Sequence, residues 1–202
     1  MAVIETTLLQ SRLTRIAGVD EAGRGPCAGP LVIAATILKD PFAPELARVK
    51  DSKALTEKVR EELFDVIIDQ SLAYSIISIS ALEIDERGLH KSNLEGMRRA
   101  VLALDVEAEY VLTDGYPIEG LPMPSLAVWK GDQVAISISA ASILAKVTRD
   151  REMIEWDKKY PVYGFAGHKG YITAKHSKAL EEHGICEIHR RSFANIQTLL
   201  IK

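Results

Sequence analysis

Two adjacent acids between two apolar segments constrain the fold of this chain more than any other feature. Asp20 and Glu21 follow the apolar residues 15–19, and a loop rich in glycine and proline then leads to the apolar residues 31–38. Both apolar segments are typical of strands, and the loop between them is typical of a hairpin-like connection. Successive residues of a strand point to opposite faces, so the two carboxylates are expected on opposite sides of the sheet unless the strand ends or bulges there.

The loop beside the acids favours a metal site over a nucleotide-phosphate loop. An unpaired carboxylate is costly to bury, and a divalent cation such as Mg²⁺, which takes oxygen ligands, removes that cost. Gly23, Gly25 and Gly29 let another backbone approach the acids, although two solvated acids at a strand end are the simpler alternative. The glycine spacing is not the dinucleotide fingerprint, and Pro26 lacks the amide that an anion would need.

Composition places the chain among globular proteins. Its 202 residues are 47% hydrophobic and 26% charged, no apolar run is long enough to cross a bilayer, and residues 1–15 lack the apolar core of a signal peptide. Cys27 and Cys186 are the only cysteines, so neither a disulfide framework nor a zinc cluster is expected. The expected location is the reducing cytoplasm.

Charge is distributed unevenly along the chain. The net charge of −3, taken alone, argues against a nucleic-acid-binding protein. Residues 146–202, however, hold 11 Lys and Arg against 7 Asp and Glu, whereas residues 1–145 hold 14 against 21. This distribution suits a polyanion bound by the C-terminal part and a metal held elsewhere, although a chance imbalance of solvated charges gives the same count.

Helices and strands are expected to alternate through the rest of the chain. Thr56 is expected to cap a helix that runs to about Gln70. Capping-box spacing at Ser80–Glu83 and Ser92–Glu95 predicts the starts of two more helices. The expected strands are residues 73–80, 109–115 and 125–129, and the expected helices are residues 81–88, 92–105, 138–160 and 171–183, with a glycine-rich loop at 164–170. This order predicts an α/β domain with a C-terminal helical extension.

Two further acids share the setting of the first pair. Asp114 and Asp132 each follow a short apolar strand and each has a neighbouring glycine. Because strand ends of one sheet bring distant residues together, we expect both to converge with Asp20 and Glu21. Converging carboxylates repel one another unless cations neutralise them, and two-metal sites stabilise the attacking and leaving oxygens of a phosphodiester. Each acid alone could be a strand-end cap, but the joint pattern predicts a metal-dependent phosphodiester site.

One acid of the set has a competitor. Asp150 is an alternative to Asp132 as the fourth acid, because it also lies in a distinctive stretch. We favour Asp132, which follows a strand and a glycine. Asp150 lies inside a predicted helix beside Arg149 and Arg151, where ion pairing is the simpler explanation. Cys27 lies near the acids, but the sequence indicates no base that would activate it.

These motifs resemble those of bacterial ribonuclease HII, the type 2 ribonuclease H family. The resemblance runs from about residue 15 to 192, and no motif follows Phe193. The matching motifs, in the family's order, are residues 18–26, 51–53, 112–115, 130–132, 139–150 and 168–171. The resemblance implies a ribonuclease H-like fold, with a mixed five-stranded sheet flanked by helices. A single domain, 1–202, would then comprise an α/β core at about 15–160 and a C-terminal helical substrate-contacting region at about 161–202.

The resemblance also implies an activity. It implies an endonuclease that cuts the RNA strand of RNA–DNA hybrids and incises on the 5′ side of ribonucleotides embedded in duplex DNA, leaving 5′-phosphate and 3′-hydroxyl ends. It implies Mn²⁺ or Mg²⁺ as cofactor, with two ions during catalysis, and Asp20, Glu21, Asp114 and Asp132 as metal ligands. We expect a monomer that does not associate with membranes.

Recognition of the ribonucleotide is expected from two places. Gly23-Arg24-Gly25 adjoins the acids, and main-chain groups there could contact a 2′-hydroxyl, although the glycines would be needed for the turn in any case. Tyr171 follows a glycine-rich basic stretch, where its ring could stack on a nucleotide or be half buried in the core. The resemblance implies that both recognise the step from ribonucleotide to deoxyribonucleotide, with the tyrosine packed on the DNA sugar.

Three lysines are candidate phosphate contacts. They are Lys53, Lys146 and Lys169, and each could instead be a solvated surface charge or, for Lys146, a helix pair with Asp150. Two other function classes stay open. A nucleic-acid-binding protein that no longer cleaves would have lost an acid, and a phosphotransferase would need a nucleotide-phosphate loop.

Overall fold

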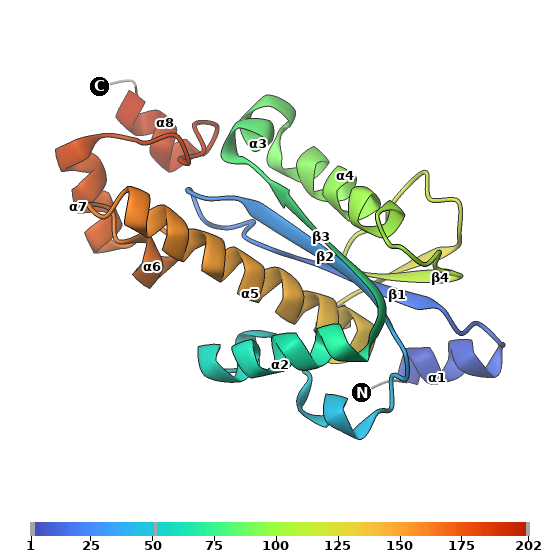
Figure 1. Ribbon diagram of the computed structural model, residues 1–202. Helices are drawn as coiled ribbons and strands as arrows, with labels where there is room; N and C mark the ends of the chain where they lie inside the picture. The colour runs from blue at the N-terminus through green and yellow to red at the C-terminus, as the bar shows by residue number, and fades with distance from the viewer. Residues whose placement is uncertain (1–2, 51, 201–202) are drawn as a thin grey trace.

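A mixed five-stranded sheet forms the centre of the molecule (Figure 1). The computed structural model describes residues 3–50 and 52–200, so Asp51 of the 51–53 motif lies outside the described residues. The strand order is β3-β2-β1-β4-β5, with β1, β2 and β3 antiparallel and with β4 and β5 parallel to β1. The expected mixed five-stranded sheet is therefore confirmed. The strands are β1 Ile16–Ala22, β2 Leu31–Leu38, β3 Ser71–Ile79, β4 Tyr110–Asp114 and β5 Ser125–Val128.

Helices cover both faces of this sheet, and a further group lies beyond one end of it (Figure 1). Helix α4 packs on one face, and α5 with α2 packs on the other. Short 3-10 turns occupy Pro44–Arg48, Ser52–Ala54 and Gly131–Gln133. The helices are α1 Val3–Gln10, α2 Glu57–Gln70, α3 Ala81–Arg87, α4 Leu89–Leu102, α5 Ile136–Lys159, α6 Phe165–His168, α7 Ala174–His183 and α8 Ala194–Leu200.

The apolar run of β2 is explained by burial on both faces. Ile33 and Ile37 pack toward α4, whereas Val32 and Ala34 pack toward α5. A strand covered by helices on both sides needs apolar residues at every position, so its sequence shows no alternation. Strand β1 follows the same alternation of faces, with Val19 on the α4 side.

A glycine in β1 determines how closely α5 approaches the sheet. A Cβ at Gly18 would lie 2.1 Å from the carbonyl carbon of Ser137, so no larger residue fits there. The buried Glu5 of α1 accepts hydrogen bonds from the Ser137 backbone N–H (3.0 Å) and hydroxyl (2.8 Å), which fixes the first turn of α5. Helix α5 is thereby held against β1 along the strand that carries the acids.

Two predicted helix starts are confirmed and two are wrong. Ser80 accepts from the Glu83 N–H, as its capping box predicts, and Thr56 accepts from the Val59 N–H. Ser92 caps nothing, because Gly88, with φ 84°, both ends α3 and begins α4, so Ser92 lies one turn inside the helix. The last predicted helix begins at Ala174 rather than at residue 171, because Thr173 is its cap.

The C-terminal helices pack on the last turns of α5 and on the loop between β1 and β2, residues 23–30, here called the glycine loop. Their apolar cluster includes Tyr163, Phe165 and Ile188 together with Cys27 of the loop and Met153 of α5. Helices α1, α6 and α8 were not predicted from the sequence, and α6 lies within the loop expected at residues 164–170. In the described ranges no helix is both long and apolar enough to cross a bilayer.

Candidate active site

Three acids lie side by side where β1 and β4 approach their ends. The parallel register pairs Val19 with Thr113, which places Asp114 level with Asp20 on the neighbouring strand. Asp20 Oδ1 accepts from the Glu21 N–H at 2.7 Å, and Asp114 Oδ1 accepts from the Gly131 N–H at 2.7 Å. The sheet therefore assembles Asp20, Glu21 and Asp114 as the sequence predicts, and backbone groups hold two of the three carboxylates.

The side chains of Asp20 and Glu21 face opposite sides of the sheet, as expected for neighbours in a strand. Asp20 lies on the α5 side, where Ser142 donates a hydrogen bond to it. Glu21 lies on the α4 side, near Asn93. The two carboxylates therefore lie on opposite faces of the same strand. Within residues 3–50 and 52–200, no group of three or more His, Cys, Asp or Glu side chains is already arranged to hold a metal ion.

The electrostatics of these acids are unfavourable without a bound cation. Burial raises the pKa of Asp20 well above its ordinary value, and the charges of Glu21 and Asp114 raise it further. Burial also raises the pKa of Glu21, opposed by the Arg24 guanidinium, whose Nη1 lies 3.5 Å from Glu21 Oε1. The fold therefore holds charged groups together at a cost in stability.

Unsatisfied polar atoms surround Glu21. In the part of the chain that the structure describes, Glu21 Oε2, Arg24 Nε and both amide atoms of Asn93 are buried without a hydrogen-bond partner. The Asn93 amide is near enough to favour the charged form of Glu21 but does not meet hydrogen-bonding geometry. Buried polar groups without partners are costly. The two oxygens among them, Glu21 Oε2 and Asn93 Oδ1, are of the type that a hard divalent cation binds, and Mg²⁺ keeps water ligands and needs only one or two carboxylates.

The two candidates for the fourth acid have different environments. Asp132 is buried in the turn after β5, next to Gly131, whose N–H binds Asp114. Asp150 is buried too, but its Oδ1 lies 2.7 Å from Lys146 Nζ and its Oδ2 lies 3.9 Å from Arg60. Asp150 is thus neutralised by cations, as its helical setting suggested. The assignment of Asp132 as the fourth catalytic acid stays a prediction.

A pocket of about 260 Å³ opens beside the acids. It is lined by Asp20 and Glu21, by the Gly23–Gly25 loop, and by Tyr171 from the C-terminal region. A Cβ at Gly25 would lie 3.3 Å from a Tyr171 ring carbon, so the ring lies over this glycine. Tyr171 is 50% exposed, so it is not a core residue and its ring stays accessible. The two places expected to recognise a ribonucleotide are therefore brought together.

The predicted lysines occupy three different positions. Lys53 is exposed at the mouth of the pocket, and Lys146 lines the pocket but is paired with Asp150. Lys169 lies outside the pocket lining, and its Nζ donates to the Ala166 carbonyl at 2.6 Å. Their roles as phosphate contacts stay predictions.

Four residues at the site were not found from the sequence. Tyr116 accepts a hydrogen bond from Arg24 at 2.7 Å and lies under its guanidinium, 4.6 Å from the ring centroid. Asn93 approaches Glu21 from α4. Arg149 and Arg190 are buried and donate to carbonyls of the glycine loop. In the sequence Arg149 was considered as a neighbour of Asp150, whereas in the structure it lines the pocket together with Ser142 and Lys146.

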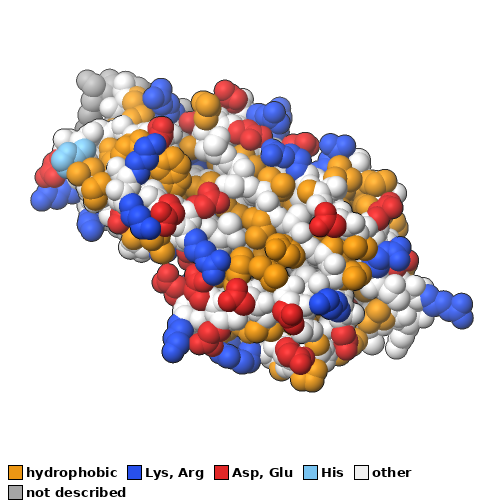
Figure 2. Space-filling view, viewed as in Figure 1, with side chains coloured by type: hydrophobic (Ala, Val, Ile, Leu, Met, Phe, Trp, Pro, Cys, Tyr) orange, Lys and Arg blue, Asp and Glu red, His pale blue; other side chains and the backbone are white. Residues whose placement is uncertain are grey.

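The surface seen in Figure 2 does not form one basic patch. Lys and Arg side chains alternate with Asp and Glu over α2, α5 and the C-terminal helices. Ion pairs explain part of this, since Lys159 lies 2.5 Å from Glu187 and Lys158 lies 2.6 Å from Glu155. On this face, at least two lysines of the C-terminal part are therefore neutralised by neighbouring glutamates.

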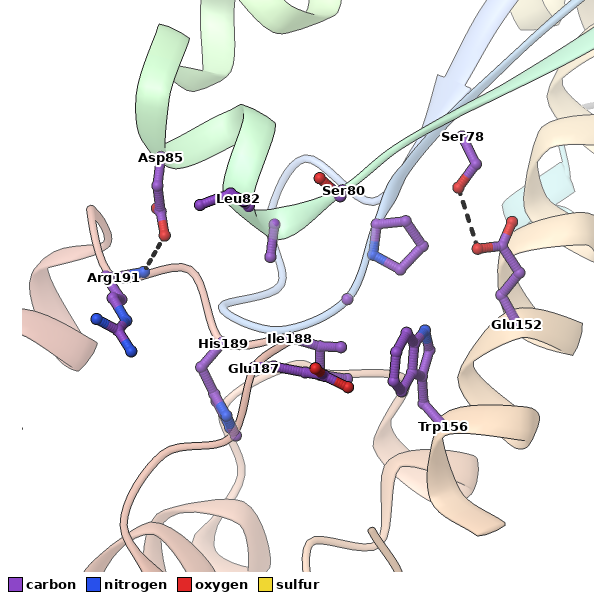
Figure 3. A pocket seen from close by; sticks show the side chains of 13 residues that line it. Ser78, Ser80, Leu82, Asp85, Glu152, Trp156, Glu187, Ile188, His189 and Arg191 are labelled. Carbon is purple, nitrogen blue, oxygen red and sulfur yellow. Dashed lines mark hydrogen bonds between the residues drawn. The ribbon is translucent and has the colours of Figure 1, made fainter. Parts of the chain in front are cut away.

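A larger cavity is lined by residues 187–189 and Arg191 of the C-terminal region (Figure 3). It has a volume of about 660 Å³ and does not include the acids of β1 and β4. Its carboxylates already have partners, since Glu152 accepts from the Ser78 hydroxyl at 3.0 Å and Asp85 accepts from the Arg191 N–H at 2.8 Å. The smaller pocket beside the acids is therefore the candidate active site.

Comparison with known proteins identifies the family of the chain. Residues 17–196 match the family model described as Ribonuclease HII. A protein named ribonuclease HII from Rhodococcus erythropolis is 55% identical over 196 residues, which cover 97% of this chain and 87% of that protein. The crystal structure of ribonuclease H2 from Pyrococcus horikoshii is 31% identical and superposes with a TM-score of 0.80, covering 92% of this chain and 96% of that one.

A more distant structure shares the fold. It is that of Bst-RNase HIII in complex with Mn²⁺, which is 18% identical, with a TM-score of 0.70 over 93% of this chain and 69% of that one. The match to the family model covers most of the chain, and the relatives agree over nearly its whole length. The chain therefore belongs to the ribonuclease HII family and is an endonuclease of the ribonuclease H type.

Proposed function

We propose that the enzyme incises duplex DNA on the 5′ side of an embedded ribonucleotide, in addition to the cleavage of RNA strands in RNA–DNA hybrids that its family membership gives it. The observation that carries this proposal is the position of the Tyr171 ring over Gly25, in the same pocket as Asp20 and Glu21. An aromatic ring can stack on a nucleotide, and backbone groups beside a glycine can reach a 2′-hydroxyl. Recognition and cleavage would then occur within one pocket.

Divalent cations complete the proposed site. Asp20, Glu21 and Asp114 would hold Mn²⁺ or Mg²⁺, with Asp132 as the fourth acid and with two ions during catalysis. The buried, mutually repelling carboxylates and the unpaired Glu21 oxygen support this assignment. When bound, the ions supply an activated water and stabilise the leaving 3′-oxygen.

The chain's own residues position the substrate. Ser142 and the Glu21 N–H fix the Asp20 carboxylate on the α5 side of the strand. Lys53 at the pocket mouth would neutralise a phosphate next to the cleaved bond. Tyr171 would pack on the deoxyribose that follows the ribonucleotide, which aligns the bond on its 5′ side with the acids. Hydrolysis there leaves a 5′-phosphate and a 3′-hydroxyl.

The test is cleavage of a DNA duplex that carries one ribonucleotide, in Mn²⁺ and in excess chelator. The proposal predicts a single cut on the 5′ side of the ribonucleotide in Mn²⁺ and none in chelator. An all-DNA duplex and the Asp20→Asn variant are the controls, and neither should yield product. A wild-type enzyme that cuts RNA–DNA hybrids but leaves this duplex intact would contradict the proposal.

Three further expectations belong to this proposal. One chain carries every residue named, so we propose that the enzyme acts as a monomer, which light scattering during turnover would test. The organisation of residues 1–202 as a single domain is proposed on the same ground, since the C-terminal helices share an apolar cluster with Cys27 and Met153. The cytoplasmic location stays a prediction.

A further inference from the structure

Arg190 is buried, and its guanidinium is directed at main-chain oxygens of the glycine loop. Its side chain is fully inaccessible to solvent. Nη2 donates to the Gly23 carbonyl at 2.6 Å, Nη1 donates to the Arg24 carbonyl at 3.2 Å, and Nε donates to the Gly29 carbonyl at 3.0 Å. Nη2 also lies 3.0 Å from the Pro30 carbonyl oxygen. One side chain thus contacts four carbonyl groups of a single loop.

The segment that carries Arg190, residues 186–192 and here called the strap, is itself attached to the loop. The Arg190 N–H donates to the Cys27 carbonyl at 2.8 Å, and the Gly29 N–H donates to the Ile188 carbonyl at 2.9 Å. On its other side the strap is anchored by Asp85 of α3, which accepts from the Arg191 N–H, as Figure 3 shows. The strap therefore has a fixed position from which Arg190 can act.

A second buried arginine completes the arrangement. Arg149 of α5 donates to the carbonyls of Pro30 (2.9 Å) and Ala28 (3.2 Å). A Cβ at Gly23, where φ is 103°, would lie 2.2 Å from Arg149 Nε, so this position requires glycine. Burial lowers the pKa of Arg190 to about 9, and the neighbouring Arg149 charge adds to this effect, so Arg190 is still protonated at neutral pH.

The direction of the carbonyls determines the direction of the amides. In a trans peptide the C=O of one residue and the N–H of the next point to opposite sides, and the described chain has no cis peptide bond. Because the carbonyls of Gly23 and Arg24 point to Arg190, the N–H groups of Arg24 and Gly25 point away from it. Arg190 does not line the pocket, whereas Gly23, Arg24 and Gly25 do. Two amide donors are thereby presented on the pocket side.

We propose that Arg190 is a positioning residue for ribonucleotide recognition, which orients the peptide groups of residues 23–25 so that their amides can contact a ribonucleotide sugar. A guanidinium is required because its planar fork of five donors can satisfy several carbonyls at once, whereas an ammonium is a single point donor. This inference rests on the proposed function, since it concerns how the same pocket recognises its substrate. The proposal gives Arg190 no role in holding the acids or the metal ions.

The experiment compares two substrates in the Arg190→Lys variant. One is a DNA duplex with a single ribonucleotide, and the other is a uniform RNA–DNA hybrid. A single ribonucleotide offers one register for recognition, whereas the hybrid offers a 2′-hydroxyl at every position, so a misplaced loop should affect the single site more. We expect kcat/KM to fall roughly 100-fold on the single ribonucleotide and about 5-fold on the hybrid.

Arg191→Lys is the matched control. It makes the same substitution at the next position, where the side chain is exposed and only the backbone N–H is bonded to Asp85. It should leave both rates near wild type. If Arg190→Lys lowers kcat/KM by the same factor on both substrates, Arg190 is merely structural and the proposal fails.

A second variant covers the case in which Arg190→Lys does not fold. Asp85→Asn loosens the strap from outside, because the Asp85 carboxylate accepts from the N–H groups of Arg191 and Ser192. It should shift the ratio of the two rates in the same direction by a smaller factor. An unchanged ratio in folded Asp85→Asn would overturn the proposal in that case.

Failure of the proposed function gives a different result. Wild-type enzyme would then cut only the hybrid, and the role of Arg190 would be measured by binding in Ca²⁺, as the Kd for all-DNA duplex divided by the Kd for the hybrid. A ratio that falls at least about 10-fold in Arg190→Lys supports the inference even then, and an unchanged ratio overturns it.

Discussion

The acid end of β1 and β4 and the glycine loop beside it both bury charge, but they do so in opposite ways. The acids Asp20, Glu21 and Asp114 are gathered without enough cations, and a Glu21 oxygen has no partner in the described chain. The loop holds the cations Arg149 and Arg190, whose guanidinium groups are bonded to main-chain carbonyls. The acid end is left uncompensated, where ions and substrate could complete it, whereas the loop carbonyls bonded to Arg149 and Arg190 already have their partners.

Removing a charge at the uncompensated end should have the largest effect on activity. Asp20→Asn keeps the shape of the side chain but removes the central metal ligand of the proposed site. We expect kcat on an RNA–DNA hybrid in Mn²⁺ to fall at least about 10³-fold, which corresponds to roughly 4 kcal/mol of transition-state stabilisation. Hybrid binding, measured by fluorescence anisotropy, should stay within about 3-fold of wild type. Residual activity above a tenth of wild type would show that Asp20 holds no essential metal.

The fourth acid gives the next largest effect and separates Asp132 from Asp150. Asp132→Asn should lower kcat roughly 100-fold. Asp150→Asn should mainly lower Tm, because it leaves Lys146 without its partner at 2.7 Å and removes the nearby charge facing Arg60. Steady-state kinetics and calorimetry on the two variants decide the matter. If Asp150→Asn loses far more activity than Asp132→Asn at equal stability, the assignment is wrong.

Tyr171 tests the recognition side of the comparison. Its ring is 50% exposed and lies over Gly25, so Tyr171→Ala should leave the fold intact. Loss of one stacking contact is expected to lower kcat/KM on a single embedded ribonucleotide about 10-fold, with Tyr171→Phe close to wild type. Kinetics of both variants on the same duplex provide the measurement. A folded Tyr171→Ala enzyme that cleaves this duplex as fast as wild type contradicts the role.

The pH dependence of stability tests whether the buried polar groups of the C-terminal region have their hydrogen-bond partners, as those of the glycine loop do. His189 Nε2 lies 3.0 Å from His176 Nε2, and both rings are buried. His176 Nδ1 donates to the Tyr171 carbonyl, so its Nε2 accepts from His189, whose Nδ1 accepts from the Cys186 N–H. Every ring nitrogen of this pair is thus used in the neutral form.

Burial and the neighbouring His176 lower the pKa of His189 from its ordinary 6.5 to about 4. The unfolded chain then binds more protons than the native state between these values, so this stability is fully present above about pH 6.5 and is lost as pH falls toward 4. The expected slope is up to about 1.4 kcal/mol per pH unit. Urea unfolding between pH 7 and 4.5 measures it, with His189→Gln flattening the slope and the exposed His183→Gln leaving it unchanged. Equal slopes in all three proteins would refute the assignment.

The acids could be predicted from the sequence because their signals are local, whereas the recognition roles of Gly23–Gly25 and Tyr171 followed from the family resemblance. Asp20 and Glu21 lie in one apolar strand, and the strand-end position of Asp114 is visible in five residues. Arg190 left no such signal, because its partners are carbonyls 160 to 167 residues away along the chain and any residue has a carbonyl. The Ser92 cap was mispredicted because the positive φ of Gly88 decides where α4 begins. Backbone geometry and long-range contacts could not be predicted, because the local pattern of residue types does not encode them.

The most direct test of the comparison is thermal unfolding of wild type and Asp20→Asn, each with and without millimolar Mn²⁺. If the acids are held together at a cost in stability, metal-free Asp20→Asn should melt above metal-free wild type, because one repelling charge has been removed from a buried position. Mn²⁺ should raise the Tm of wild type by several degrees and leave Asp20→Asn nearly unchanged. A metal-free wild type that melts with or above Asp20→Asn and does not respond to Mn²⁺ would contradict the account.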